Sequence, residues 1–173
     1  EVAKRVQTFG MKIIAFDPYI SSNAAEKLGI QLVNQDELIR KSDYISLHLP
    51  LTNDTHHSIS YREFDMMKSN CRVINCARGG LVDETALLEA LKNGKISGAA
   101  LDVFEEEPPD NSALMELENF IATPHLGAYT TEAQDHVARE IAQKVIDSLR
   151  RFPVDGAINP PRMDQFEALS PYL

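Results

Sequence analysis

The sequence predicts an α/β protein built on a doubly wound parallel sheet, and three observations support this. Short apolar runs of strand length alternate with amphipathic stretches of helix length through about the first 150 residues. Several of these runs are almost wholly apolar, which is typical of parallel strands covered on both faces. The connections between them are short and contain residues that start or end helices. The pattern therefore favours one open sheet with helices on both faces.

The strands come first in the argument because they define the sheet. Each expected strand is a short run of mainly apolar residues. The expected strands are residues 12–16, 31–33, 44–49, 72–76, 98–103 and 120–122.

The helices between them are predicted from their end signals. The expected N-terminal signals are two capping boxes, Ser60 with Glu63 and Thr131 with Gln134, and a cap from Asp83 for residues 84–93. Apolar residues recur on one side of residues 1–9, which predicts a first helix there. Glycines at positions 10, 29 and 94 fall where helices should end. A long helix is expected at residues 131–151.

Composition narrows the class of protein. The 173 residues carry a net charge of −9 without a basic cluster, which argues against a nucleic-acid partner. No apolar run approaches the roughly 18 residues of a membrane span, and no signal peptide is evident, so we expect a cytoplasmic protein. The two cysteines, Cys71 and Cys76, are too few for a disulfide framework and are expected to be reduced and buried.

Ligands of such sheets bind beyond the carboxyl ends of the strands, so the residues there are candidates for chemistry. Asp17 ends the first expected strand and is placed to accept hydrogen bonds from the ribose hydroxyls of an adenine nucleotide. Its charge would repel a 2′-phosphate, which favours NAD over NADP. The alternative is that Asp17 and Pro18 only form a turn.

Arg78 follows a buried strand and precedes two glycines. A guanidinium there is suited to bidentate binding of a substrate carboxylate. The alternative is a structural ion pair with a nearby acid.

The next two strand ends supply an acid and a base. Asp102 is placed to bind the nicotinamide carboxamide, and Glu107 is stiffened by the two prolines that follow it. His125 follows the last strand. Arg78, Glu107 and His125 would then share one edge of the sheet, as an anion-binding and proton-transfer set.

Five segments of this chain resemble the D-isomer-specific 2-hydroxyacid dehydrogenase family, in the same order and spacing. They are F-D-P at residues 16–18, S-L-H-L-P-L-T at 46–52, N-C-A-R-G-G-L-V-D-E at 75–84, A-L-D-V-F-E-E-E-P at 100–108 and T-P-H-L-G-A at 123–128. The N-C-A-R-G-G and P-H-L-G-A runs, with A-I-N-P-P at 157–161, are most similar to the phosphoglycerate dehydrogenase branch.

The resemblance implies a Rossmann-type NAD-binding domain in which Arg78 binds the substrate, His125 is the acid/base and Glu107 orients it. The cofactor-binding residues it implies are Asp17, Leu49, Pro50, Cys76, Ala77, Arg78, Asp102, His125, Gly127 and Ala128. It further implies NAD as cofactor, no metal, a homodimer formed through the nucleotide domain, and oxidation of 3-phosphoglycerate to 3-phosphohydroxypyruvate in serine biosynthesis. The alternatives are another 2-hydroxyacid dehydrogenase, of glycerate/hydroxypyruvate or lactate type, and a non-catalytic, NAD-sensing corepressor-like scaffold. A methyltransferase ranks below these.

The domain organisation follows from the same pattern. Residues 1–150 are expected to form the NAD-binding domain with a C-terminal connector helix. Residues 151–173 are expected to be a proline-rich exit toward the substrate domain or a regulatory domain. No G-x-G-x-x-G run precedes the first helix, so we expect the chain to begin after the first strand and the phosphate-binding loop. The remaining histidines are expected to have no catalytic role: His48 packs or supports the site, His56 and His57 form a loop, and His136 lies on the surface.

Overall fold

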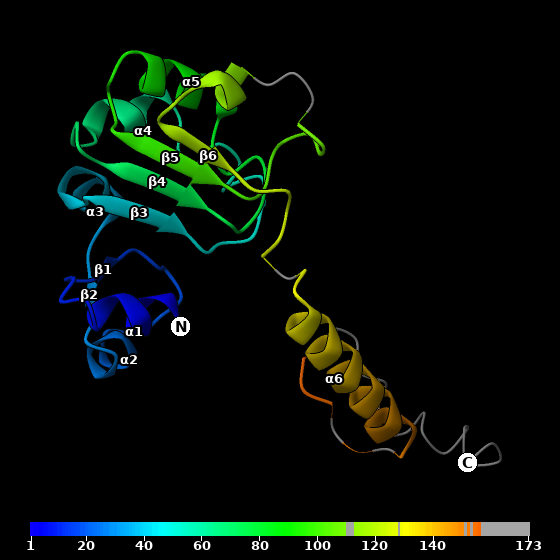
Figure 1. Cartoon of the computed structure of the whole chain (residues 1–173). Helices are drawn as coiled ribbons and strands as arrows, with labels where there is room; N and C mark the ends of the chain where they lie inside the picture. Colours follow the sequence, from blue (N-terminus) through cyan, green and yellow to red (C-terminus); the bar gives the residue numbers. More distant parts are fainter. Residues whose placement is uncertain (110–112, 128, 151, 153, 157–173) are drawn as a thin grey trace. The chain divides into compact units, whose positions relative to one another are not determined.

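The computed structural model describes residues 1–109, 113–127, 129–150, 152 and 154–156. The chain divides into two compact units, Glu1–His125 and Leu126–Leu173. In the first unit, parallel strands alternate with helices, which confirms the predicted α/β class (Figure 1). The strands are β1 (Ile14–Ala15), β2 (Gln31–Leu32), β3 (Tyr44–Leu47), β4 (Arg72–Asn75), β5 (Gly98–Leu101) and β6 (Phe120–Ala122). Each lies within its predicted range.

The paired strands form two sheets in the part of the chain that the structure describes. One sheet contains β1 and β2, and the other has the order β3-β4-β5-β6. The register of the larger sheet aligns the last residues of its strands in one row, Leu47, Asn75, Leu101 and Ala122. Residues that follow these four strands therefore lie at a common edge, where parallel sheets bind ligands.

At several helix starts a side chain accepts a free N–H group, as Ser21, Asn34, Asp83 and Thr130 do, whereas the first helix, after Glu1, has no such bond. The helices are α1 (Val2–Gln7), α2 (Ser22–Lys27), α3 (Gln35–Lys41), α4 (Tyr61–Met66), α5 (Glu84–Lys92), the 3-10 turn η1 (Ala113–Glu116) and α6 (Thr131–Leu149). Ser60 and Glu63 form the predicted capping box of α4, and Asp83 caps α5 as predicted. The prediction for α6 was wrong by one residue. Thr130 is the cap there, and the third helical residue is then Ala133, whose methyl group cannot accept the hydrogen bond that a capping box requires.

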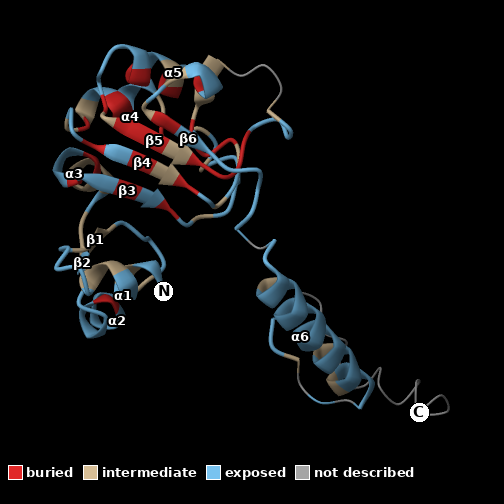
Figure 2. Cartoon of the chain, viewed as in Figure 1, coloured by how far each residue is buried: buried red, intermediate tan, exposed pale blue. Residues whose placement is uncertain are grey.

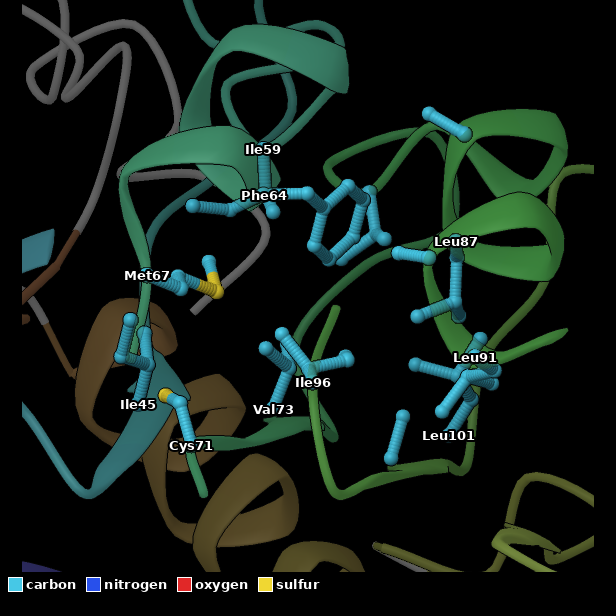
Figure 3. Close-up of a cluster of buried hydrophobic side chains, with 14 of the residues drawn as sticks. Ile45, Ile59, Phe64, Met67, Cys71, Val73, Leu87, Leu91, Ile96 and Leu101 are labelled. Carbon is cyan, nitrogen blue, oxygen red and sulfur yellow. The ribbon is translucent and has the colours of Figure 1, made fainter. Parts of the chain in front are cut away.

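The core lies on one face of the larger sheet. Alternate residues of β3 and β4 point into it, and α4 and α5 cover them (Figure 2). The cluster includes Ile45, Ile59, Phe64, Met67, Cys71, Val73, Leu87, Leu91, Ile96 and Leu101 (Figure 3). The expectation that the strands are covered on both faces holds best for β5. On the other face Tyr44 of β3 and Ile121 of β6 are 49% and 65% exposed.

The second unit is described mainly by α6, none of whose residues is buried. None of the helices in the described ranges combines the length and the apolar character needed to cross a membrane.

Candidate active site

Arg78 lies in the turn that follows β4, and a buried asparagine shapes this turn. The side chain of Asn75, 1% exposed, accepts a hydrogen bond from the N–H of Ala77 (3.0 Å) and donates one to the carbonyl of Arg78 (2.8 Å). The exposed guanidinium donates from Nη1 to the carbonyl of Ala77 (2.6 Å). Among the described residues, no carboxylate forms an ion pair with Arg78. The structural ion pair considered from the sequence is therefore absent from this part of the chain.

Gly79 brings the Arg78 turn against the loop that follows β5. A Cβ added at Gly79 would lie 1.8 Å from the carbonyl oxygen of Phe104 and 3.0 Å from the backbone nitrogen of Glu105. Only a residue without a side chain permits this approach of the two backbones. The turn with Arg78 and the loop with Glu107 are therefore in direct contact.

Glu107 and His125 form a hydrogen-bonded pair, with 2.7 Å between Oε2 of Glu107 and Nδ1 of His125. The other carboxylate oxygen, Oε1, accepts the N–H of Phe104 (3.1 Å). The hydrogen bond with His125 and the N–H of Phe104 together lower the pKa of Glu107. An ionised carboxylate only accepts hydrogen bonds, so Nδ1 of His125 carries the proton of this contact. In the neutral ring, Nε2 is then unprotonated.

His125 is held in an uncommon backbone conformation. Its φ is +54°, in the left-handed region that residues other than glycine rarely occupy. Its N–H donates to the carbonyl of Thr123 (3.0 Å). Such conformations tend to occur where a side chain must be aimed for function.

Asp102 directly follows β5 and is buried, at 5% exposure. Its N–H donates to the carbonyl of Asn75 (2.9 Å), and its Oδ1 accepts the hydroxyl hydrogen of Thr123. The residue therefore lies between the ends of β4 and β6, and its carboxylate is bonded to the residue that follows β6.

A hollow of about 520 Å³ opens beside these groups. Asp102, Glu107 and His125 contribute to its wall. The rest of the lining is mainly apolar: Phe104, Pro108, Pro109, Met115, Ala122, Thr123 and Pro124. Arg78 does not line the hollow. It lies near the hollow because its neighbour Gly79 contacts Phe104, which is part of the wall. A hollow with an apolar wall and a few convergent polar groups is typical of a small-molecule site.

The other residues expected at the cofactor lie at strand ends, with varied exposure. Asp17 follows β1, and one carboxylate oxygen accepts the N–H of Tyr19 (2.8 Å), as in a turn. Leu49 and Ala77 pack in part against the core, whereas Pro50 is exposed. Gly127 is exposed in the second unit, and Ala128 lies outside the described residues.

The two cysteines are free, but only one is buried as expected. Cys71 belongs to the core, and burial raises the pKa of its thiol to about 11. Cys76 is exposed, because β4 ends one residue earlier and leaves it at the open edge. Partial burial, followed by the charge of Asp102, raises the pKa of its thiol.

The remaining histidines differ from their expected roles in two cases. His48, expected to pack or to support the site, is exposed, and its ring hydrogen-bonds the hydroxyl of Ser46 (2.9 Å). His57 is more than a loop residue, because its ring binds Glu105 (2.9 Å). His136 is on the surface of α6 as expected. The described residues contain no group of three or more His, Cys, Asp or Glu side chains that could hold a metal ion.

Three residues of this region were not singled out from the sequence. Asn75 and Gly79 lie within the N-C-A-R-G-G run beside Arg78, so the motif was the available signal for them. Thr123 likewise opens the T-P-H-L-G-A run, but its contact with Asp102, 21 residues away, has no signal in the sequence.

Comparison with known proteins gives a consistent match. Residues 1–127 match the family model "D-isomer specific 2-hydroxyacid dehydrogenase, NAD binding domain". The D-3-phosphoglycerate dehydrogenase of Methanocaldococcus jannaschii is 47% identical over 100% of this chain and 34% of its own length. The enzyme of that name from Bacillus subtilis is 44% identical over 99% of this chain and 33% of its own length. The chain thus spans about a third of these relatives.

Solved structures give the same result for the fold. A D-isomer specific 2-hydroxyacid dehydrogenase from Lactobacillus delbrueckii ssp. bulgaricus, in its NAD-complexed form, matches with a TM-score of 0.83 and 27% identity, over 91% of this chain and 51% of that one. D-lactate dehydrogenase from Escherichia coli matches with a TM-score of 0.78 and 35% identity, over 91% and 50%.

Proposed function

The chain belongs to the D-isomer specific 2-hydroxyacid dehydrogenase family, as its NAD-binding domain, and on that premise we propose that the protein oxidises a D-2-hydroxy acid with NAD. The observation that carries the proposal is the 2.7 Å hydrogen bond between Glu107 and His125 beside an open hollow. We propose 3-phosphoglycerate as the substrate and 3-phosphohydroxypyruvate as the product, because the relatives at 47% and 44% identity are named for that acid.

The donor groups that follow the strands of the two sheets fit NAD. Asp17 has one carboxylate oxygen in the turn to Tyr19 and a second one for the ribose hydroxyls. Leu49, Pro50, Cys76 and Ala77 follow β3 and β4 at the common edge, where their backbone can line the cofactor. Asp102 would face the nicotinamide carboxamide. NAD, when bound, supplies the acceptor for the hydride that leaves C2 of the substrate.

In the oxidation, Nε2 of His125 accepts the proton of the substrate 2-hydroxyl. Glu107 accepts the hydrogen bond of Nδ1, fixes the tautomer that leaves Nε2 free, and stabilises the imidazolium that forms. The guanidinium of Arg78 uses one N–H for Ala77, and its other N–H groups bind the substrate carboxylate and polarise the developing carbonyl. In the reverse direction, His125 returns the proton.

Steady-state kinetics of the full-length protein with 3-phosphoglycerate and NAD test this proposal. His125→Ala should lower kcat by about 10²–10⁴-fold and leave the affinity for NADH nearly unchanged, because the ring acts mainly on the proton. Arg78→Ala should raise KM for the acid and also lower kcat. His136→Asn, on the exposed face of α6, is the matched control. Near-normal turnover of His125→Ala would refute the assignment.

A panel of D-2-hydroxy acids, with glycerate and lactate beside 3-phosphoglycerate, tests the substrate. A preference for either of the first two would move the protein to another branch of the family. Binding of NADH without turnover of any acid would favour the non-catalytic scaffold.

We further propose that the full-length protein is a cytoplasmic homodimer. The free thiols of Cys71 and Cys76 support a reducing compartment, and the family resemblance supports the dimer. Light scattering during size-exclusion chromatography and cell fractionation test the two statements.

A further inference from the structure

The loop of residues 104–107 is anchored on two sides. On one side Glu107 binds His125. On the other, the N–H of Glu105 donates to Oε1 of Glu84 (2.7 Å), at the start of α5. Oε1 of Glu105 in turn faces the N–H of Glu84 at 3.5 Å. The backbone that places Glu107 is therefore attached to the first turn of α5.

His57 completes the second anchor from a distant part of the chain. Its Nε2 lies 2.9 Å from Oε1 of Glu105, and its Nδ1 lies 3.8 Å from Oδ2 of Asp83. The segment that carries it runs beside residues 80–83. The N–H of His57 donates to the carbonyl of Gly80 (2.8 Å), and Ile59 forms a bridge with Val82. The ring is thus held between the cap of α5 and the loop of Glu107.

The backbone of His57 is in a conformation that L residues rarely adopt, with φ +51°. Gly visits this region routinely, and Asn does so among the residues with side chains. A strained residue persists where its surroundings hold it. Here these are the carbonyl of Gly80, the two carboxylates that the ring faces and the ring of His56, which stacks on it with 3.8 Å between the centroids.

The charges around Glu105 make the imidazole important for the loop. The pKa of Glu84 is raised, chiefly by burial; the N–H of Glu105 lowers it, the charges of Glu105 and Glu106 raise it, and His57 lowers it. Without the imidazole, the carboxylates of Glu84 and Glu105 would face each other with less compensation, and repulsion would push the side chain of Glu105 away. The N–H contact of Glu105 with Glu84 would weaken with it.

We propose that His57 is a positioning residue, which holds Glu105 and through it the loop of residues 104–107, so that Glu107 keeps His125 in its working tautomer. This inference rests on the proposed function for its catalytic consequence, but its structural content does not. His57 does not line the hollow and is not a catalytic residue.

The test uses the full-length protein with His57→Asn, Glu105→Ala and the double variant. Asn keeps the left-handed backbone and removes the ring, while Glu105→Gln keeps an acceptor for Nε2. We expect kcat to fall roughly tenfold in both single variants, with KM for NAD unchanged, because a small displacement of a positioned group is costly in rate. The double variant should be no slower than either single one. Glu105→Gln should keep most of the wild-type kcat that Glu105→Ala loses. His136→Asn should have the wild-type kcat.

A second readout does not depend on turnover. In protein containing isotopically labelled histidine, the ring nitrogen shifts report the tautomer of His125. We expect protonated Nδ1 in wild type and a mixture of tautomers in His57→Asn and Glu105→Ala.

Wild-type ring shifts for His125 in both single variants would overturn the positioning role, whatever the rates. If wild-type protein oxidises none of the acids, the proposed function fails, while a changed tautomer in the variants still supports the positioning role. Normal kcat in His57→Asn, in an active protein, would also overturn it.

Discussion

The hydrogen bond between Nδ1 of His125 and Oε2 of Glu107 joins the segments that follow two neighbouring strands, β5 and β6. The other carboxylate oxygen of Glu107, Oε1, accepts the N–H of Phe104. Both contacts favour the ionised form of the carboxylate. The geometry of the pair therefore depends on the charge of Glu107.

Stability should therefore depend on pH through Glu107. The hydrogen bond with His125, followed by the N–H of Phe104, lowers the pKa of Glu107 from its usual 4.5. A carboxyl group with a lowered pKa in the folded state stabilises the fold above its unfolded pKa, and this stabilisation is lost as the pH falls through the folded pKa. We expect wild type to have a higher Tm than Glu107→Gln at neutral pH, and the difference to shrink below pH 4.5. Thermal melts of both proteins across the acid range measure this. A difference that stays constant down to about pH 3 would contradict it.

Gly79→Ala should disturb the site without adding charge or polarity. The new methyl group would lie 1.8 Å from the carbonyl oxygen of Phe104, so the loop with Glu107 or the turn with Arg78 must move. We expect kcat/KM to fall by roughly 10²-fold, as for a displacement of about 1 Å. Gly94→Ala is the control, because Gly94 has φ +64° but no atom within 4 Å of an added Cβ. It should lower stability by about 1 kcal/mol and keep the rate. Equal kinetics of the two variants would argue against the close approach as the cause.

Asn75→Asp should separate the two hydrogen bonds that shape the Arg78 turn. The carboxylate can still accept the N–H of Ala77, but it cannot donate to the carbonyl of Arg78. A buried acceptor without its donor costs about 1–3 kcal/mol. We expect a lower Tm and a higher KM for the hydroxy acid, since Arg78 is then less well placed. KM and Tm equal to those of wild type would show that Asn75 does not support the turn.

The strand positions could be predicted from the sequence because each strand is an apolar run, and the register then brings the ends of β4, β5 and β6 together. Arg78, Asp102, Glu107 and His125 were singled out by that rule, and the structure confirms that they follow these strand ends, while their roles stay a proposal. The caps of α4 and α5 were also correct, because Ser60, Glu63 and Asp83 act within one helical turn. Residues close together in the sequence were enough to predict these caps.

Contacts between distant loops could not be predicted in this way. His57 and Glu105 are 48 residues apart, and the approach of Gly79 to Phe104 depends on how two loops pack. Both contacts are made by loops, in which the apolar residues do not recur at the spacing of a strand or a helix. The exposure of Cys76 was missed for a related reason, because the strand was expected to extend one residue further than it does.

The two cysteines offer a last test, of the boundary between the core and the sheet edge. Cys71 is fully buried with a thiol pKa of about 11, so neither access nor thiolate is available for alkylation near neutral pH. Cys76 is exposed, and its raised pKa makes its alkylation slow near neutrality and faster as the pH rises. Of these two cysteines, we expect iodoacetamide to modify only Cys76 in the native protein and both after unfolding in urea, as peptide mass spectrometry would show. NADH should protect Cys76, because this residue is proposed to line the cofactor. If Cys71 were modified as fast as Cys76, the helices that cover β4 would have to open readily. If saturating NADH did not slow the alkylation of Cys76, this residue would not belong to the cofactor site.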